Sequence, residues 1–191
     1  MYLGEMVDGE RFSVYDMKNT QEGKAMQITI ERAMPQDAAN ILEHLKIVGG
    51  ETDNLTFGAE GMPFSVADEE KFITQLQESG DGLMLVAKDG GKVVAVATLN
   101  RFPRRMSHRG EFGLSAQKAY WNQGLGSRLL AETIIFAKEH NFEIIDLEVL
   151  SENKRAIHVY EKFGFKKIGC HPKYHKVGDK FDAADFMCLE L

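Results

Sequence analysis

The sequence has few cysteines and no long apolar run. Only two cysteines, Cys170 and Cys188, occur in 191 residues. That is too few for the disulfide framework of a small secreted domain, so we expect a reducing, cytoplasmic setting. No apolar stretch approaches the length that crosses a bilayer, and the N-terminus lacks a signal-peptide pattern. These absences argue against a disulfide scaffold and a membrane protein, and we expect no membrane partner.

Positive charge is also in short supply. The chain has 23 Lys and Arg against 29 Asp and Glu, which gives a formal net charge of −6. Nucleic-acid-binding domains usually need a basic face, so we expect no nucleic acid partner. A cationic or amine substrate fits this charge better. With 43% hydrophobic residues, a chain of this length can form one domain with a substantial core.

The most informative stretch combines an apolar run, two glycines and an amphipathic run. Residues 112–116 are mostly apolar, Gly124 and Gly126 follow, and residues 129–137 have helical periodicity. This order predicts a strand, a tight loop and the N-terminus of a helix. Glycine lets a ligand approach the backbone, and the free N–H groups of a first helical turn favour an anion, most often a phosphate. Taken alone, Gly-x-Gly is weak evidence, and a simple tight turn explains it equally well.

Two common phosphate-binding patterns do not fit these glycines. No Gly-Lys-Ser/Thr follows them, which argues against a Walker loop. A third glycine and an acidic residue on a following strand are missing, which argues against a Rossmann nucleotide site. We therefore predict a pyrophosphate-binding loop of another type.

A second stretch, after the next predicted strand, also points to a ligand. At about 100° per residue, Asn153, Ala156 and Tyr160 fall on one helical face, and Gly164 ends the helix. An amide and a phenol on either side of a small residue suit a ligand groove better than a core.

Together the two stretches resemble the GNAT superfamily of acyl-CoA N-acyltransferases. The family's first signature, Arg/Gln-x-x-Gly-x-Gly/Ala, matches at Gly124 and Gly126 but has Trp121 in place of Arg or Gln. The second, Asn-x-x-Ala-x-x-x-Tyr-x-x-x-Gly-Phe, matches at every fixed position from Asn153 to Phe165. The resemblance covers about residues 27–191.

The resemblance implies one N-acetyltransferase domain over residues 26–191. Its fold class is α/β (α+β): a three-layer domain with a central, mostly antiparallel mixed sheet, splayed between the fourth strand, about residues 111–116, and the fifth, about residues 145–149. The implied co-substrate is acetyl-CoA. The implied acceptor is a small-molecule amine or a peptide N-terminus, and a homodimer is an open alternative to a monomer. No metal site is expected.

The implied cofactor-binding residues follow the fourth strand, the glycine loop and the second signature. They are Leu114, Ser115, Ala116, Asn122, Gln123, Gly124, Leu125, Gly126, Ser127, Asn153 and Tyr160. The backbone of Leu114 and Ala116 is expected to pair with the pantetheine arm of CoA. Trp121 is expected to pack the loop if backbone N–H groups hold the pyrophosphate.

Acetyl transfer to an amine needs a proton acceptor and, for the departing thiolate, a proton donor. The second signature makes Tyr160 the implied donor. For the acceptor, the family's Glu positions fall on His108 or Gly110 here, and Glu111 points to the opposite face of the strand. His108, Glu111 and a water relay all stay open as the base. If none serves, the alternative is a non-catalytic module that binds or senses acyl-CoA.

The first 25 residues differ from the rest because they are polar, contain Gly4, Gly9 and Gly23, and show no sustained period. We predict a flexible extension there, or translation that starts near Met26, rather than an arm to a neighbouring subunit. Further along, Gly49-Gly50 is expected to end a helix, Ser65 and Asp68 to begin another, and Asp89-Gly90-Gly91 to form a hairpin turn. A short strand over 166–169 and a loop holding His171 and His175 are expected near the end.

Overall fold

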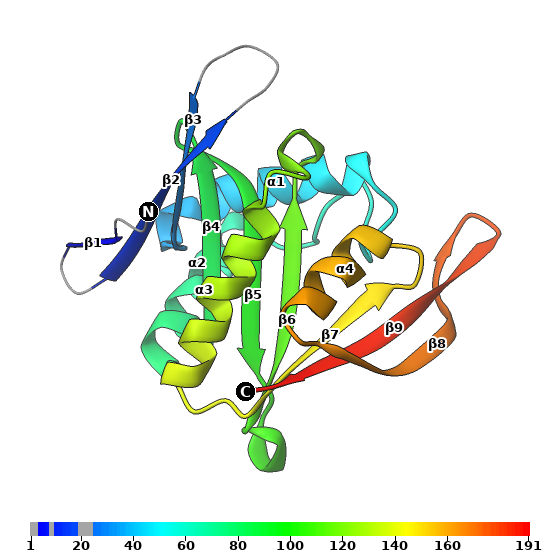
Figure 1. The fold of residues 1–191 in the computed structure, drawn as a ribbon. Coiled ribbons are helices and arrows are strands. Elements are labelled where there is room, and N and C mark those ends of the chain that lie inside the picture. Colours follow the sequence, from blue (N-terminus) through cyan, green and yellow to red (C-terminus); the bar gives the residue numbers. More distant parts are fainter. Residues whose placement is uncertain (1–3, 8–9, 19–24) are drawn as a thin grey trace.

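The computed structural model describes residues 4–7, 10–18 and 25–191, with side chains from residue 28 onward. Its strands are β1 (Gly4–Val7), β2 (Glu10–Lys18), β3 (Ala25–Arg32), β4 (Gly82–Asp89), β5 (Lys92–Arg101), β6 (Arg109–Ala116), β7 (Ile144–Leu150), β8 (Lys166–Val177) and β9 (Lys180–Glu190). Its α-helices are α1 (Ala38–Glu51), α2 (Val66–Ser79), α3 (Leu125–Glu139) and α4 (Lys154–Lys162). Across the described residues, all nine strands belong to one sheet in the order β1-β2-β3-β4-β5-β6-β7-β9-β8 (Figure 1).

The sheet is antiparallel at every described pair except β6 and β7. These two strands run parallel and pair only from Arg109 with Ile144 to Glu111 with Asp146. Beyond that point they diverge (Figure 1). The predicted mixed, mostly antiparallel sheet is confirmed, and its splay lies between the predicted fourth and fifth strands, which are β6 and β7.

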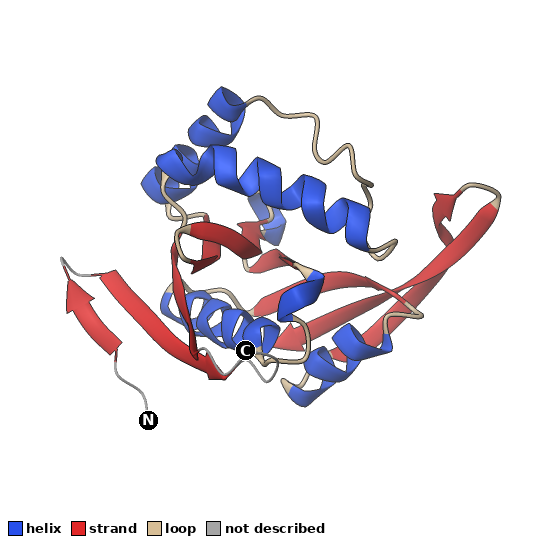
Figure 2. Ribbon diagram, turned by 90° about the horizontal axis from the view of Figure 1, so that it is seen from above, coloured by secondary structure: helices blue, strands red, loops and turns tan. Residues whose placement is uncertain are grey.

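Helices cover both faces of the sheet, so the domain has three layers (Figure 2). Alternation along β4 explains how one strand serves both faces. Leu83 and Leu85 join the cluster beneath α3 and α4, whereas Met84 and Val86 join the cluster beneath α1 and α2. None of the helices in the described ranges is long and apolar enough to cross a membrane.

Two local predictions are confirmed by their hydrogen bonds and dihedral angles. The Ser65 Oγ accepts from the Asp68 N–H at 3.1 Å, and the Asp68 carboxylate accepts from the Ser65 N–H at 3.1 Å, which begins α2 with a capping box. Gly90 and Gly91 join β4 to β5 with φ of +55° and +82°. That left-handed backbone is the one that favours glycine in a hairpin turn.

Two other boundary predictions were wrong. Helix α1 continues through Gly49 to Glu51. A Cβ on Gly49 would lie 1.9 Å from the Gly58 carbonyl oxygen, so this glycine lets the following loop pack on the helix instead of ending it. Strand β8 continues through His171 and His175, with a register shift between them. Pro172 lacks an N–H for the ladder, which accounts for a bulge where the sequence suggests a loop.

The N-terminal segment extends the sheet instead of leaving its edge at β3. In the described parts of this segment, β2 pairs antiparallel with β3, and β1 pairs with β2. No side-chain period predicts these strands, because an edge strand can form through backbone hydrogen bonds alone. Residues 1–3, 8–9 and 19–24 lie outside the described part, and the flexibility of residues 1–25 stays a prediction.

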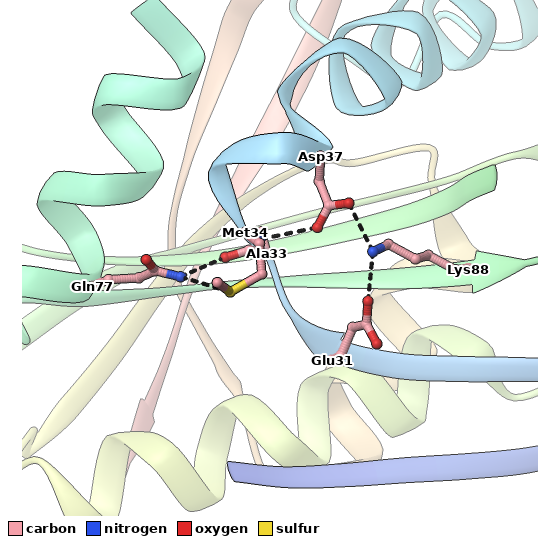
Figure 3. A network of polar contacts seen from close by, with 6 residues as sticks. All are labelled: Glu31, Ala33, Met34, Asp37, Gln77 and Lys88. Carbon is pink, nitrogen blue, oxygen red and sulfur yellow. Dashed lines mark hydrogen bonds and ion pairs between the residues drawn. The ribbon is translucent and has the colours of Figure 1, made fainter. Parts of the chain in front are cut away.

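A polar network fixes the start of α1 to the sheet (Figure 3). The Lys88 ammonium lies 2.5 Å from a Glu31 oxygen and 2.7 Å from an Asp37 oxygen, which joins β4, β3 and the turn before α1. The second Asp37 oxygen accepts from the Met34 N–H at 3.0 Å. On the other side, the Gln77 amide of α2 donates to the Ala33 carbonyl at 2.9 Å. These contacts hold α1 and α2, the two helices of one layer, over β3 and β4.

Candidate functional site

A cavity of about 520 Å³ lies where β6 and β7 separate. Its wall brings together β6, the glycine loop, both ends of α4, the loop after α1, and the β8–β9 hairpin. The lining includes Thr52, Asn54, Leu55, Thr56, Phe57, Asn100, Glu111, Phe112, Gly113, Leu114, Ser115, Ala116, Trp121, Asn122, Gly124, Leu125, Gly126, Ser127, Glu148, Asn153, Arg155, Ala156, Tyr160, Tyr174 and His175. The splay therefore opens the sheet into a ligand-sized space.

The backbone of β6 alternates between its partner β5 and this cavity. The Gln117 N–H donates to the Val94 carbonyl of β5 at 3.0 Å. The Ala116 carbonyl instead accepts from the Trp121 indole Nε1–H at 2.8 Å. Because backbone groups alternate sides along a strand, Leu114 and Ala116 direct theirs into the splay, where β7 no longer pairs with β6. This arrangement suits an extended chain with amide groups, although Trp121 already uses the Ala116 carbonyl.

The N-terminus of α3 forms one end of the cavity. Gly124 caps the helix with φ of +79° and without a side-chain hydrogen bond, so the N–H groups of the first turn stay available. A Cβ on Gly126 would meet the Leu114 side chain at 3.2 Å and narrow the cavity. Free donors, a helix dipole and a close backbone approach fit a diphosphate at this end.

Helix α4 supplies another wall of the cavity. The Asn153 side chain caps it by accepting from the Ala156 N–H at 3.3 Å. One turn after Ala156, the ring of Tyr160 is buried and makes an edge-to-face contact with Phe112 of β6. Burial raises the pKa of Tyr160 well above its ordinary value of 10, so the phenol stays protonated at neutral pH.

Two carboxylates lie where the splay begins. Glu111 of β6 and Glu148 of β7 both line the cavity. Burial, followed by the charges of Glu148 and Asp146, raises the pKa of Glu111. The Tyr174 hydroxyl of β8 donates to the Glu148 carboxylate. Burial and this hydrogen bond raise the pKa of Tyr174 to about 12. The cavity thus has a negative region far along the strand from the glycine loop.

A family model described as Acetyltransferase (GNAT) family matches residues 53–165, which is more than half of the chain. The chain belongs to the GNAT family. It is 32% identical to N-alpha-acetyltransferase RimI of Mycobacterium tuberculosis over 92 residues, covering 48% of this chain and 56% of that relative. The aligned part thus spans little more than half of the curated relative's length.

Solved structures of GNAT proteins share the fold along most of the chain. A GNAT-family acetyltransferase from Streptococcus pneumoniae superposes with a TM-score of 0.83 and 29% identity, covering 86% of this chain and 99% of that one. A GNAT superfamily phosphinothricin acetyltransferase from Sinorhizobium meliloti, solved in complex with acetyl-CoA, has a TM-score of 0.75 at 18% identity, covering 86% and 88%. The latter likeness concerns the fold alone.

Most residues that the sequence assigns to a GNAT site meet in the cavity, but two do not. His108 lies in the turn before β6, where its carbonyl accepts the N–H groups of Glu143 and Ile144, and it does not line the cavity. Gln123 turns its amide to the Ala119 carbonyl at 2.8 Å and is also outside the lining. The structure thus separates His108 from Tyr160 and brings Glu111 to the same cavity.

Ser115 has a place that the GNAT signatures do not specify. Its backbone pairs with Val96 of β5, not with the splay. Its Oγ lies 2.9 Å from Nε2 of His44, which is 1% exposed in α1, and burial lowers the pKa of His44 to about 4. The Gln117 amide lies 3.5 Å from the other ring nitrogen. Neutral His44 therefore fixes the Ser115 side chain at the cavity wall.

Several lining residues were missed by the sequence analysis. Glu148, Tyr174 and His175 come from β7 and β8. The loop after α1, which supplies Thr52 and residues 54–57, lies where the family resemblance implies one side of the acceptor pocket. For Glu148 a signal was present, since it alternates with buried Leu147 and Val149. The β8 residues had no such signal, because their proximity to β6 arises only when β7, β8 and β9 assemble.

Proposed function

We propose that this protein transfers the acetyl group of acetyl-CoA to a primary amine by direct attack in a ternary complex. One geometric observation carries the proposal. Glu111 and Phe112 are consecutive in β6, so their side chains lie on opposite faces of the sheet. Tyr160 packs against Phe112, with ring centroids 6.2 Å apart. A proton acceptor and a proton donor therefore face the splay from opposite sides.

Acetyl-CoA supplies the acetyl group and the thiolate leaving group. In this proposal the backbone of Leu114 pairs with its pantetheine arm, and the first turn of α3, from Leu125 to Ser127, holds its pyrophosphate. At Leu114, β7 no longer pairs with β6, so this side of the β6 backbone has no partner strand. The first turn of α3 has no side-chain cap. The reactive end then lies near Phe112 and Tyr160.

Deprotonation of the acceptor is assigned to Glu111. An alkylamine with a pKa near 10.4 is almost fully protonated at pH 7, and its deprotonation costs about 4.6 kcal/mol there. A carboxylate with a raised pKa accepts that proton more readily than an ordinary one. His108, the other candidate from the sequence, lies outside the cavity lining. A water between the amine and Glu111 would serve as a relay.

Tyr160 is assigned as the proton donor to the departing thiolate. Its raised pKa keeps the phenol protonated until the thiolate forms. A backbone N–H of β6 that faces the splay is the donor for the developing oxyanion. Each chemical step is then served by β6 or α4, and both elements line the cavity.

The acceptor is assigned as a small-molecule amine or a peptide N-terminus. Glu111 and Glu148 offer negative charge to a protonated amine, which supports a cationic substrate. The name of the mycobacterial relative, an N-alpha-acetyltransferase, supports the peptide N-terminus. A homodimer and a cytoplasmic setting stay predictions.

A panel of amines with acetyl-CoA tests the proposal. The panel contains free amino acids, amino-acid amides, short peptides and polyamines. Release of the CoA thiol is followed over time. We expect steady CoA release with at least one amine, and intersecting initial-rate lines as direct attack requires. Tight acetyl-CoA binding without turnover on any amine would instead favour the acyl-CoA-binding alternative, and parallel lines would contradict direct attack.

A further inference from the structure

The chain departs from the first GNAT signature at one position, and the structure shows which contacts the substituting side chain makes. Trp121 stands where the signature has Arg or Gln. Its indole N–H is bound to the Ala116 carbonyl at 2.8 Å, so the ring is fixed between the end of β6 and the glycine loop. Trp121 thus packs the loop, as expected from the sequence, and it also lines the cavity.

A cation from the second signature lies on that ring. The guanidinium carbon of Arg155, in the first turn of α4, is 3.7 Å from the centroid of Trp121. Stacking at this distance is a cation–π contact, which orients the planar group and leaves its N–H donors at the edges. In the described part of the chain Arg155 forms no ion pair with a carboxylate. It lines the same cavity as Gly124 and Gly126.

We infer that Arg155, oriented by Trp121, binds the pyrophosphate of CoA together with the N-terminus of α3. This chain has Trp121 where the first signature can have Arg. In this inference Arg155, 34 positions later in the sequence, supplies the positive charge instead. A guanidinium matches phosphate oxygens with two parallel hydrogen bonds, and it stays charged at all working pH values. Trp121 acts as a positioning residue, because it touches Arg155 and the loop. The inference rests on the proposal that acetyl-CoA fills this cavity.

The chain offers a direct readout of this contact, because Trp121 is its one tryptophan. We expect CoA to change the intrinsic fluorescence of the wild-type protein, and titration then gives a dissociation constant without any turnover. Arg155→Met removes the charge and keeps an apolar stem over the ring. Lys154→Met is the matched control. It removes the same charge from the neighbouring residue, whose side chain is exposed.

We expect Arg155→Met to weaken CoA binding about tenfold to a hundredfold, as for the loss of a charge-assisted hydrogen bond. Lys154→Met should weaken it less than threefold. Isothermal titration calorimetry serves as a second measurement, because the substitution also changes the surroundings of the fluorophore. Trp121→Phe, studied by calorimetry, should give an intermediate loss because a smaller ring holds the guanidinium less firmly.

Truncated ligands identify the phosphate. Dephospho-CoA keeps the pyrophosphate and lacks the 3′-phosphate, so the Arg155→Met loss should persist with it, and it should vanish with pantetheine. A loss that disappears with dephospho-CoA would assign Arg155 to the 3′-phosphate and overturn the inference. An equal loss with pantetheine would show a structural effect, which also overturns it, as would equal CoA binding by the two variants. If the wild-type protein does not bind CoA at all, the proposed function itself fails.

Discussion

The ring of Tyr160 meets the ring of Phe112 edge to face, with centroids 6.2 Å apart and planes at 87°. Phe112 is the first residue of β6 beyond the last pair with β7. The contact therefore crosses from α4 to the strand at the point where the splay begins. It places the one phenol of the second signature beside the backbone that is proposed to bind pantetheine.

This contact separates the chemical role of Tyr160 from its packing role. Tyr160→Phe keeps the ring and removes the proton donor. We expect turnover with the best amine to fall by roughly 10²–10⁴-fold, with little change in acetyl-CoA affinity or thermal midpoint. Single-turnover kinetics would show whether chemistry limits the rate. Full turnover in the Phe variant under that condition would mean that the thiolate leaves without help from Tyr160.

Glu111→Gln tests whether Glu111 accepts the proton of the amine, because the amide keeps the shape of the side chain and cannot act as a base. Because the pKa of Glu111 is raised in the folded protein, activity should rise with pH through a limb above the ordinary Glu value, and the Gln variant should lose that limb. Glu143→Gln, on an exposed carboxylate outside the cavity lining, is the control and should keep it. A pH–rate profile of kcat/KM makes the comparison. Identical limbs in the wild type and Glu111→Gln would rule out Glu111 as the base.

Glu111→Gln, which is expected to lower activity, should raise the thermal stability of the protein at neutral pH. A carboxyl group whose folded pKa is raised destabilises the protein at pH values above that pKa, and it has no such effect below the unfolded value near 4.3. Glu111→Gln should therefore melt slightly higher than the wild type at pH 7 and at about the same temperature near pH 4. A lower melting temperature at pH 7 would show that Glu111 is held by favourable contacts instead.

Gly126→Glu tests the cavity end at α3. The Glu side chain would enter the space beside Leu114 and bring a negative charge to the proposed diphosphate site. We expect calorimetry to show loss of acetyl-CoA binding, at least a hundredfold given the repulsion and the steric block. Gly50→Glu adds the same charge on the exposed side of α1, where a Cβ finds ordinary contacts, and should bind normally. Equal binding by both variants would place the cofactor elsewhere.

His44 should make the fold sensitive to mild acid. Its pKa is near 4 in the folded protein and near 6.5 when unfolded, so only the unfolded chain takes up the proton as pH falls through this window. Stability should drop by up to about 3 kcal/mol between pH 7 and pH 4 from this group, at 1.36 kcal/mol per pKa unit. His44→Gln keeps a donor for Ser115 and should flatten that slope in denaturant melts. An unchanged slope would assign the acid sensitivity to other groups.

Local patterns were sufficient for the parts of the site that lie close together in the sequence. The glycine loop, the α3 start and the common face of Asn153, Ala156 and Tyr160 follow from helix geometry and from the freedom of Gly124 to take a positive φ. The order of strands and helices indicated an α/β domain with a mostly antiparallel sheet, and the resemblance to the GNAT superfamily implied the three layers. Glu111 could be named as a base candidate but not preferred over His108, since the sequence does not reveal where the splay begins.

The sequence by itself determined the family, the glycine loop before α3 and the phenol on α4, because each depends on residues within one or two turns of chain. Only the tertiary structure decided that Glu111 faces the cavity with Glu148, that Tyr174 binds Glu148, and that Arg155 stacks on Trp121. It also revealed the strands β1 and β2, which pair through backbone groups that every sequence carries. The side-chain contacts join segments tens of residues apart. Their partners are selected by how the strands pair and where they separate, which no local period encodes.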